Sequence, residues 1–199
     1  MTASSLDLRR RLHAVAFGQA GYFSSAQAVE AGYSHQAQKY HVDAGNWTRV
    51  DRGIFRLTDW PPSPEDEYVR WTLWSRGRGV VSHESALRAH SLSDANPARL
   101  HLTVPPGFRA QDDFVVTHIG ELDPADRIDY HGWSVTSIPR TLADVAGTES
   151  VSQEIVDDAV RGALAGGNTT ERRLRRLAHD LPAVAALRLE RALGTVARD

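Results

Sequence analysis

Apolar residues near the start of the chain recur with the period of a helix. Leu8, Leu12, Val15 and Ala16 fall at spacings of three and four residues. This spacing predicts an amphipathic helix with one buried face, which ends close to Gly21.

Two shorter helical patterns follow, over residues 23–32 and 33–45. Ser24 and Ser34 are the expected N-caps, because a serine hydroxyl accepts a backbone N–H of the first helical turn. Gly32 is expected to end the first of these helices. Two short helices joined by Gly-Tyr-Ser predict a helix-turn-helix. The inward-facing positions expected in the second helix are Ala37, Tyr40 and Val42.

Residues 46–57, NWTRVDRGIFRL, change from the helical period to alternation around an Asp-Arg-Gly turn. Alternating apolar and polar residues on both sides of Gly53 predict a β-hairpin. Three helices followed by a hairpin predict a winged helix-turn-helix domain over residues 1–59. A small α/β subdomain without a ligand is the alternative.

The remaining residues, 60–199, predict a second domain that is mixed α/β to about residue 147 and helical beyond it. The proline-rich stretch 61–64 is typical of a boundary between the two domains. Short β-rich runs at 100–105 and 114–120 predict strands of a small sheet. The fold class is therefore α+β: a winged helix-turn-helix, then a mixed α/β domain with a helical tail. Aromatic residues spaced for one helical face are expected in the core rather than stacked on bases: Tyr68, Trp71 and Trp74.

Composition narrows the functional classes. The chain has 199 residues with 41% hydrophobic and 24% charged residues, which is ordinary for a globular protein. With no cysteine, disulfides, thiol catalysis and cysteine-ligated zinc are excluded. No apolar run is long enough for a membrane span, and the N-terminus has no apolar core of a signal peptide. We expect a cytoplasmic protein with no membrane partner.

Charge is distributed unevenly along the chain. Residues 1–58 carry seven basic and four acidic side chains, whereas residues 59–147 carry eight basic and thirteen acidic ones. A basic N-terminal domain suits a DNA phosphate backbone. Donor side chains on the second helix of the helix-turn-helix and arginines of the hairpin supply the expected contacts. The residues that we expect to bind DNA are His35, Gln36, Gln38, Lys39, Arg49, Arg52 and Arg56.

No motif for catalysis is evident, and we expect neither a catalytic residue, nor a cofactor, nor a metal site. Phosphate-binding glycine loops and serine-hydrolase elbows are missing. His83, Glu84 and His90 resemble part of a zinc-protease motif, but seven residues separate the histidines. That separation is about 10.5 Å along a helix, too far for two ligands of one ion.

A divergent nuclease is a further enzymatic alternative, because four carboxylates lie in one part of the sequence: Asp144, Glu149, Asp157 and Asp158. Metal-dependent nucleases pair such carboxylates with a lysine. The single lysine of this chain is Lys39, within the proposed DNA-binding domain. This argues against nuclease activity.

The segment GYFSSAQAVEAGYSHQAQKYHVDAGNWTRVDRGIFRL resembles the N-terminal winged helix-turn-helix of the AbiEi-like type IV antitoxins. The segments SHESALRAHSLSDANPARLHLTVP and WSVTSIPRTLADVAG resemble the second domain of that family, and together the resemblance covers about residues 10–147. It implies autorepression through inverted repeats in promoter DNA. It also implies that the C-terminal portion counteracts a nucleotidyltransferase-like toxin.

The mode of neutralisation stays open: direct binding, action at the toxin's target, and promotion of toxin modification are all compatible with the sequence. A stand-alone winged-helix transcriptional regulator, with a C-terminal domain that senses a ligand, is the alternative function.

Overall fold

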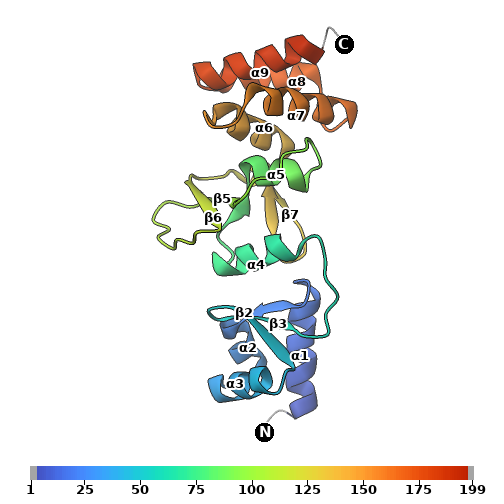
Figure 1. Ribbon diagram of the computed structural model, residues 1–199, viewed down its shortest axis with the longest axis vertical. Coiled ribbons are helices and arrows are strands. Elements are labelled where there is room, and N and C mark those ends of the chain that lie inside the picture. The colour runs from blue at the N-terminus through green and yellow to red at the C-terminus, as the bar shows by residue number, and fades with distance from the viewer. Residues whose placement is uncertain (1–3, 197–199) are drawn as a thin grey trace. The chain divides into compact units, whose positions relative to one another are not determined.

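The computed structural model, which describes residues 4–196, shows a mixed α/β protein (Figure 1). Its internal contacts divide into two compact units. Unit 1 comprises the chain up to Gly79 together with Tyr130–Ser134, and unit 2 comprises the remainder.

Unit 1 places helices around a three-stranded antiparallel sheet of order β1-β3-β2. Its elements are α1 (Ser5–Phe17), β1 (Tyr22–Ser24), α2 (Ser25–Ala31), α3 (His35–Asp43), β2 (Trp47–Asp51), β3 (Ile54–Leu57) and α4 (Asp66–Trp74). The three predicted N-terminal helices and the hairpin are present. Strand β1 was not predicted, because three residues are too few to show a period of two.

The predicted ends of α2 and the predicted start of α3 are confirmed, whereas α1 ends at Phe17, four residues before Gly21. Ser24 caps α2 by accepting from the N–H of Gln27, whose side chain accepts from the N–H of Ser24 in return. Ser34 caps α3 in the same way through the N–H of Ala37. Gly32 ends α2 at φ +108°, a left-handed conformation that glycine adopts without a Cβ clash.

The core of unit 1 is aromatic. Phe23 is fully buried and packs edge-on against Trp47, with ring centroids 4.9 Å apart. Leu12 and Ala16 bring the apolar face of α1 to this cluster, as their spacing predicted. Tyr40, expected inside, is instead 65% exposed.

Helix α4 belongs to unit 1, and the boundary between the units follows Gly79 rather than residue 59. Tyr68 and Trp71 are buried, as expected of core residues. Two ion pairs then fasten α4 to the hairpin: Arg56 Nη2 to Asp66 Oδ2 at 2.8 Å, and Arg70 Nη2 to Asp51 Oδ2 at 3.4 Å. The proline-rich stretch is thus a connection within unit 1.

Unit 2 is built on a five-stranded mixed sheet of order β6-β5-β4-β8-β7. Strands β5 and β6 are parallel, as are β4 and β8, whereas β4 and β5 are antiparallel. The sheet elements are β4 (Val80–Val81), β5 (Leu100–Val104), β6 (Val115–Ile119), β7 (Arg127–Asp129) and β8 (Ser134–Thr136).

Helices supply the larger core of unit 2 (Figure 1). They are α5 (His83–Ala89), the 3₁₀ turn η1 (Pro124–Asp126), α6 (Ile138–Gly147), α7 (Gln153–Ala165), α8 (Glu171–Asp180) and α9 (Ala183–Val196). The predicted helical tail is confirmed, and Gly-Gly-Asn at 166–168 and Leu-Pro at 181–182 separate its last three helices. Fully buried leucines such as Leu142 and Leu189 join α6 to α9.

Candidate nucleic-acid interface

Helix α3 presents three of its four predicted DNA-binding residues to solvent. His35, Gln36 and Lys39 are exposed near its N-terminal half. Tyr40 joins them, because four residues separate it from Gln36 and place both on one helical face. The four-residue spacing from Gln36 was visible in the sequence. It places Tyr40, which was expected in the interior, on the exposed face of α3.

Gln38 is the exception on α3, and its prediction as a DNA contact is wrong. It is 3% exposed, and its side-chain amide is occupied. Its Oε1 accepts from Ser25 Oγ at 2.7 Å, and its Nε2 donates to the carbonyls of Ser25 and Tyr33 at 3.2 and 3.3 Å. Gln38 therefore fixes α3 against the start of α2.

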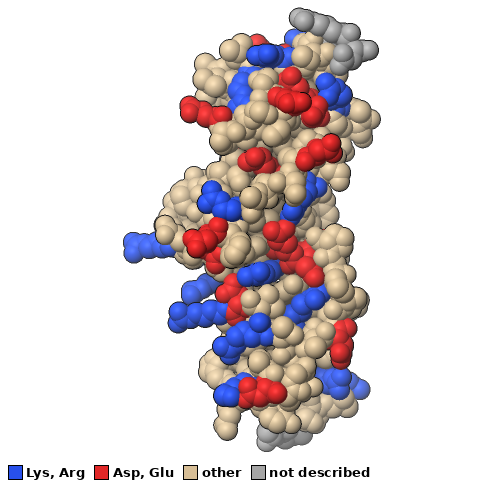
Figure 2. Space-filling view, viewed as in Figure 1, with Lys and Arg blue, Asp and Glu red and all other residues tan. Residues whose placement is uncertain are grey.

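The hairpin exposes two arginines around its turn. Arg52 lies in the turn itself, where its backbone N–H donates to Asp51 Oδ1 and Gly53 adopts φ +73°. Arg49, on β2, is also exposed, and its guanidinium lies 5.6 Å from the centroid of the Phe55 ring. Figure 2 shows basic side chains gathered over the hairpin of unit 1.

Arg56, which was also expected to contact DNA, does not lie on this surface. The register pairs Arg49 with Phe55, and because side chains alternate along a strand, Arg56 points to the opposite face. There its guanidinium lies 5.1 Å from the Tyr22 ring centroid and donates to the carbonyl of Pro61 at 2.9 Å. Only 17% of the side chain is exposed, and Asp66 neutralises it.

Five of the seven predicted residues thus remain available to a ligand: His35, Gln36, Lys39, Arg49 and Arg52. Lys39 is paired with Asp43 in the free protein, with 73% of the lysine side chain exposed, so the pair is open to exchange. His41, in the last turn of α3, does not add positive charge to this surface. His41 stacks on Trp47 at 4.6 Å, and burial lowers its pKa.

Unit 2 contains a histidine cluster that the sequence analysis did not assemble. The rings of His83 and His118 stack with centroids 3.5 Å apart, and His118 Nε2 lies 3.1 Å from His101 Nδ1. Burial, the largest cause, lowers the pKa of His83 to about 3 and that of His118 to about 4. His101 Nε2 lies 3.6 Å from Glu84, but burial lowers the histidine pKa and raises the glutamate pKa. At neutral pH His101 is therefore neutral, and its contact with Glu84 is not an ion pair.

The histidines and carboxylates that the sequence suggested as metal ligands do not form one cluster. His90 donates from Nε2 to the carbonyl of Thr136 at 2.8 Å, away from the stacked histidines. Asp144 accepts from Arg140 Nε at 2.8 Å, and Asp158 pairs with Arg161. Within residues 4–196 no group of three or more histidines and carboxylates is arranged to hold a metal ion. In that same range no helix has the length and apolarity to cross a bilayer.

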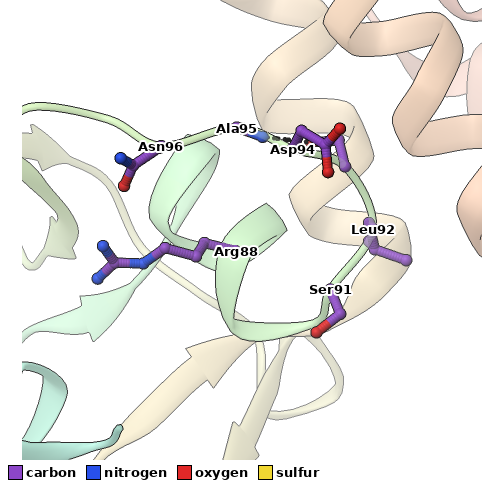
Figure 3. Close-up of a pocket in the computed structure, with 7 residues that line it drawn as sticks. Arg88, Ser91, Leu92, Asp94, Ala95 and Asn96 are labelled. Atoms are coloured by element: carbon purple, nitrogen blue, oxygen red, sulfur yellow. Dashed lines mark hydrogen bonds between the residues drawn. The ribbon is translucent and has the colours of Figure 1, made fainter.

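A depression of about 570 Å³ follows α5 (Figure 3). It is open to solvent, whereas small-molecule sites usually enclose most of their ligand. Its lining residues come from the end of α5 and the loop after it: Arg88, Ser91, Leu92, Ser93, Asp94, Ala95 and Asn96. The depression does not favour a ligand-sensing role for unit 2.

No family model and no curated protein matches the chain. Among solved structures, it is similar to the crystal structure of the RV2827C protein from Mycobacterium tuberculosis, with a TM-score of 0.58 and 16% sequence identity. The similarity covers 96% of this chain and 78% of that chain. At this identity the likeness concerns the fold alone. The chain thus shares its fold, over nearly its whole length, with a mycobacterial protein.

Proposed function

We propose that unit 1 is a winged helix-turn-helix that binds duplex DNA through α3 and the β2–β3 turn. The observation that carries the proposal is the set of five exposed donors on these two elements. The order of α1, α2, α3 and the hairpin is that of such a domain, with α3 as the helix that enters the major groove.

The two elements then have different tasks. Gln36 and Lys39, near the N-terminal half of α3, are suited to base edges: glutamine pairs with adenine and lysine with guanine. Arg49 and Arg52 are suited to phosphates, which contribute affinity without sequence preference. Gln38 and Arg56 hold these surfaces in place and do not contact DNA.

For the whole chain we propose a non-enzymatic antitoxin that represses its own operon, with unit 2 counteracting a nucleotidyltransferase-like toxin. The resemblance of the sequence blocks to AbiEi-like antitoxins supports this. Residues 80–129 of unit 2, with eight acidic and four basic side chains, support it as well. A toxin that handles nucleotides needs a basic site, toward which acidic residues steer.

The DNA-binding proposal is tested by the salt dependence of affinity for the protein's own promoter. Each phosphate contact contributes about 0.9 to the slope of log K against log salt. Arg49→Ala/Arg52→Ala should therefore lower the slope by up to about 1.8. The matched control, Arg99→Gln/Arg109→Gln, removes two exposed arginines of unit 2 and should leave it unchanged. An unaltered slope in the first variant would refute the assignment.

The antitoxin proposal is tested with the same full-length variant. The proposal expects a nucleotidyltransferase toxin gene beside this one. Arg49→Ala/Arg52→Ala, co-expressed with that toxin, should still restore growth while the promoter is derepressed. Loss of protection together with repression would contradict the division of roles. No protection by the wild-type protein would favour the stand-alone regulator.

A further inference from the structure

Helix α8 presents positive charge over most of its exposed surface. Leu174 and Ala178 form its buried face, through which it packs on α9 and α6. Four of the exposed residues in its first two turns are arginines, and Glu171 is the one exposed acid there: Arg172, Arg173, Arg175 and Arg176.

Most of this charge has no partner in the protein. Arg175 pairs with Glu171 at 2.6 Å. Arg172, Arg173 and Arg176 form no ion pair with any residue between positions 4 and 196. Like charges at a spacing of four, as in Arg172 and Arg176, destabilise a helix. The arrangement therefore does not serve the stability of α8.

Other arginines of unit 2 are used differently. Arg140 donates to both Asp126 and Asp144, at 3.0 and 2.8 Å. Arg188 donates to three backbone carbonyls at the α6–α7 connection, those of Ala146, Thr148 and Val151. These two arginines are part of the fold, whereas Arg172, Arg173 and Arg176 of α8 are not.

We propose that the arginine face of α8 binds the phosphate backbone of a nucleic acid. Guanidinium groups match phosphate geometry and are weakly hydrated, which makes arginine the usual residue for this task. Arg172 and Arg176 lie about 6 Å apart along the helix axis. Phosphate contacts carry no sequence information, so we expect this binding to be independent of sequence.

Other partners fit this surface less well. A basic amphipathic helix that binds a membrane inserts its apolar face, but Leu174 and Ala178 are already fully or almost fully buried in unit 2. The α8 face has no exposed large hydrophobic side chain, which the centre of a stable protein interface usually contains. The surface belongs to unit 2, so it does not depend on the DNA-binding role proposed for unit 1.

The test uses the full-length protein, with Arg49→Ala/Arg52→Ala in every sample to reduce binding through unit 1. Arg172→Gln/Arg176→Gln is compared with this parent for binding to a duplex DNA of arbitrary sequence and to a double-stranded RNA of equal length. We expect the slope of log K against log salt to fall by up to about 1.8 on at least one polymer. A fall on only one of them assigns DNA or RNA as the source of the phosphates.

Two further variants separate local recognition from bulk charge. Arg172→Lys/Arg176→Lys should keep most of the slope, because the charges remain in place. Arg99→Gln/Arg109→Gln changes the net charge equally and should keep the parent slope. The proposal is overturned if the α8 glutamine variant retains the parent slope on both polymers, or if the Arg99/Arg109 control loses as much.

Discussion

Replacing His83 should remove a defined part of the pH dependence of stability. His83 is 8% exposed, stacks on His118, and has Arg140 among the charges that disfavour its protonation. Its pKa is about 3 in the fold, against an ordinary value of 6.5. The unfolded chain therefore takes up the proton first as the pH falls. The contribution of His83 to the free energy of unfolding is fully present above about pH 6.5, and it is lost as the pH falls toward 3.

The size of the effect follows from proton linkage. Between pH 7.5 and 5.5 the unfolded histidine becomes mostly protonated while the folded one stays neutral. This difference costs about 1.4 kcal/mol of unfolding free energy. Glu84 and Asp144 act with the opposite sign, because burial raises their pKa values. Both groups are present in wild type and in the His83 variant, so their contribution cancels when the two proteins are compared.

His83→Asn is the suitable variant, since position 83 has φ +53° and asparagine tolerates that conformation. Denaturant unfolding should be followed by far-ultraviolet circular dichroism, because all five tryptophans lie in unit 1 and their fluorescence reports on that unit. The stability lost from pH 7.5 to 5.5 should be smaller by about 1–2 kcal/mol in His83→Asn than in wild type. His179→Asn, at a position where 88% of the side chain is exposed, is the control and should change nothing. Equal losses in wild type and His83→Asn would refute the reasoning.

Four further predictions distinguish residues that stabilise the fold from exposed residues. Gln38→Ala should destabilise unit 1 by about 1–3 kcal/mol through the loss of its buried hydrogen bonds, as measured by tryptophan fluorescence. Gln36→Ala should leave stability unchanged and instead alter preference among promoter variants by about 1–3 kcal/mol at one base pair; a uniform loss over all variants would point to a phosphate contact. Arg56→Ala should destabilise unit 1 by about 1.5–3 kcal/mol because Asp66 is left unpaired, whereas Arg52→Ala should not. Arg188→Ala should destabilise unit 2 by about 1–3 kcal/mol because three carbonyls lose their donor, and the exposed Arg191→Ala should have no such effect in circular dichroism.

The sequence alone determined the local structure at the start of the chain. The Ser24 and Ser34 caps and the left-handed Gly32 are set by residues three or four positions apart. Such interactions follow from side-chain chemistry at short range, and they appear at the predicted positions. The spacing of Leu12 and Ala16 likewise determined which face of α1 is buried.

Only the tertiary structure decided which predicted polar residues are accessible. Gln38 and Gln36 have the same chemistry, but α2 covers Gln38 and leaves Gln36 in solvent. Arg49 and Arg56 both belong to the hairpin, but the strand register and the docking of α4 send them to different environments.

The histidine cluster also depended on tertiary structure, because its members come from three elements. His83 begins α5, and the parallel pairing of β5 with β6 brings His101 near His118, seventeen residues further along the chain. No local pattern encodes a contact over that separation. A sequence specifies such contacts only through the packing of the whole unit, which is why helix caps were predictable and the buried histidines were not.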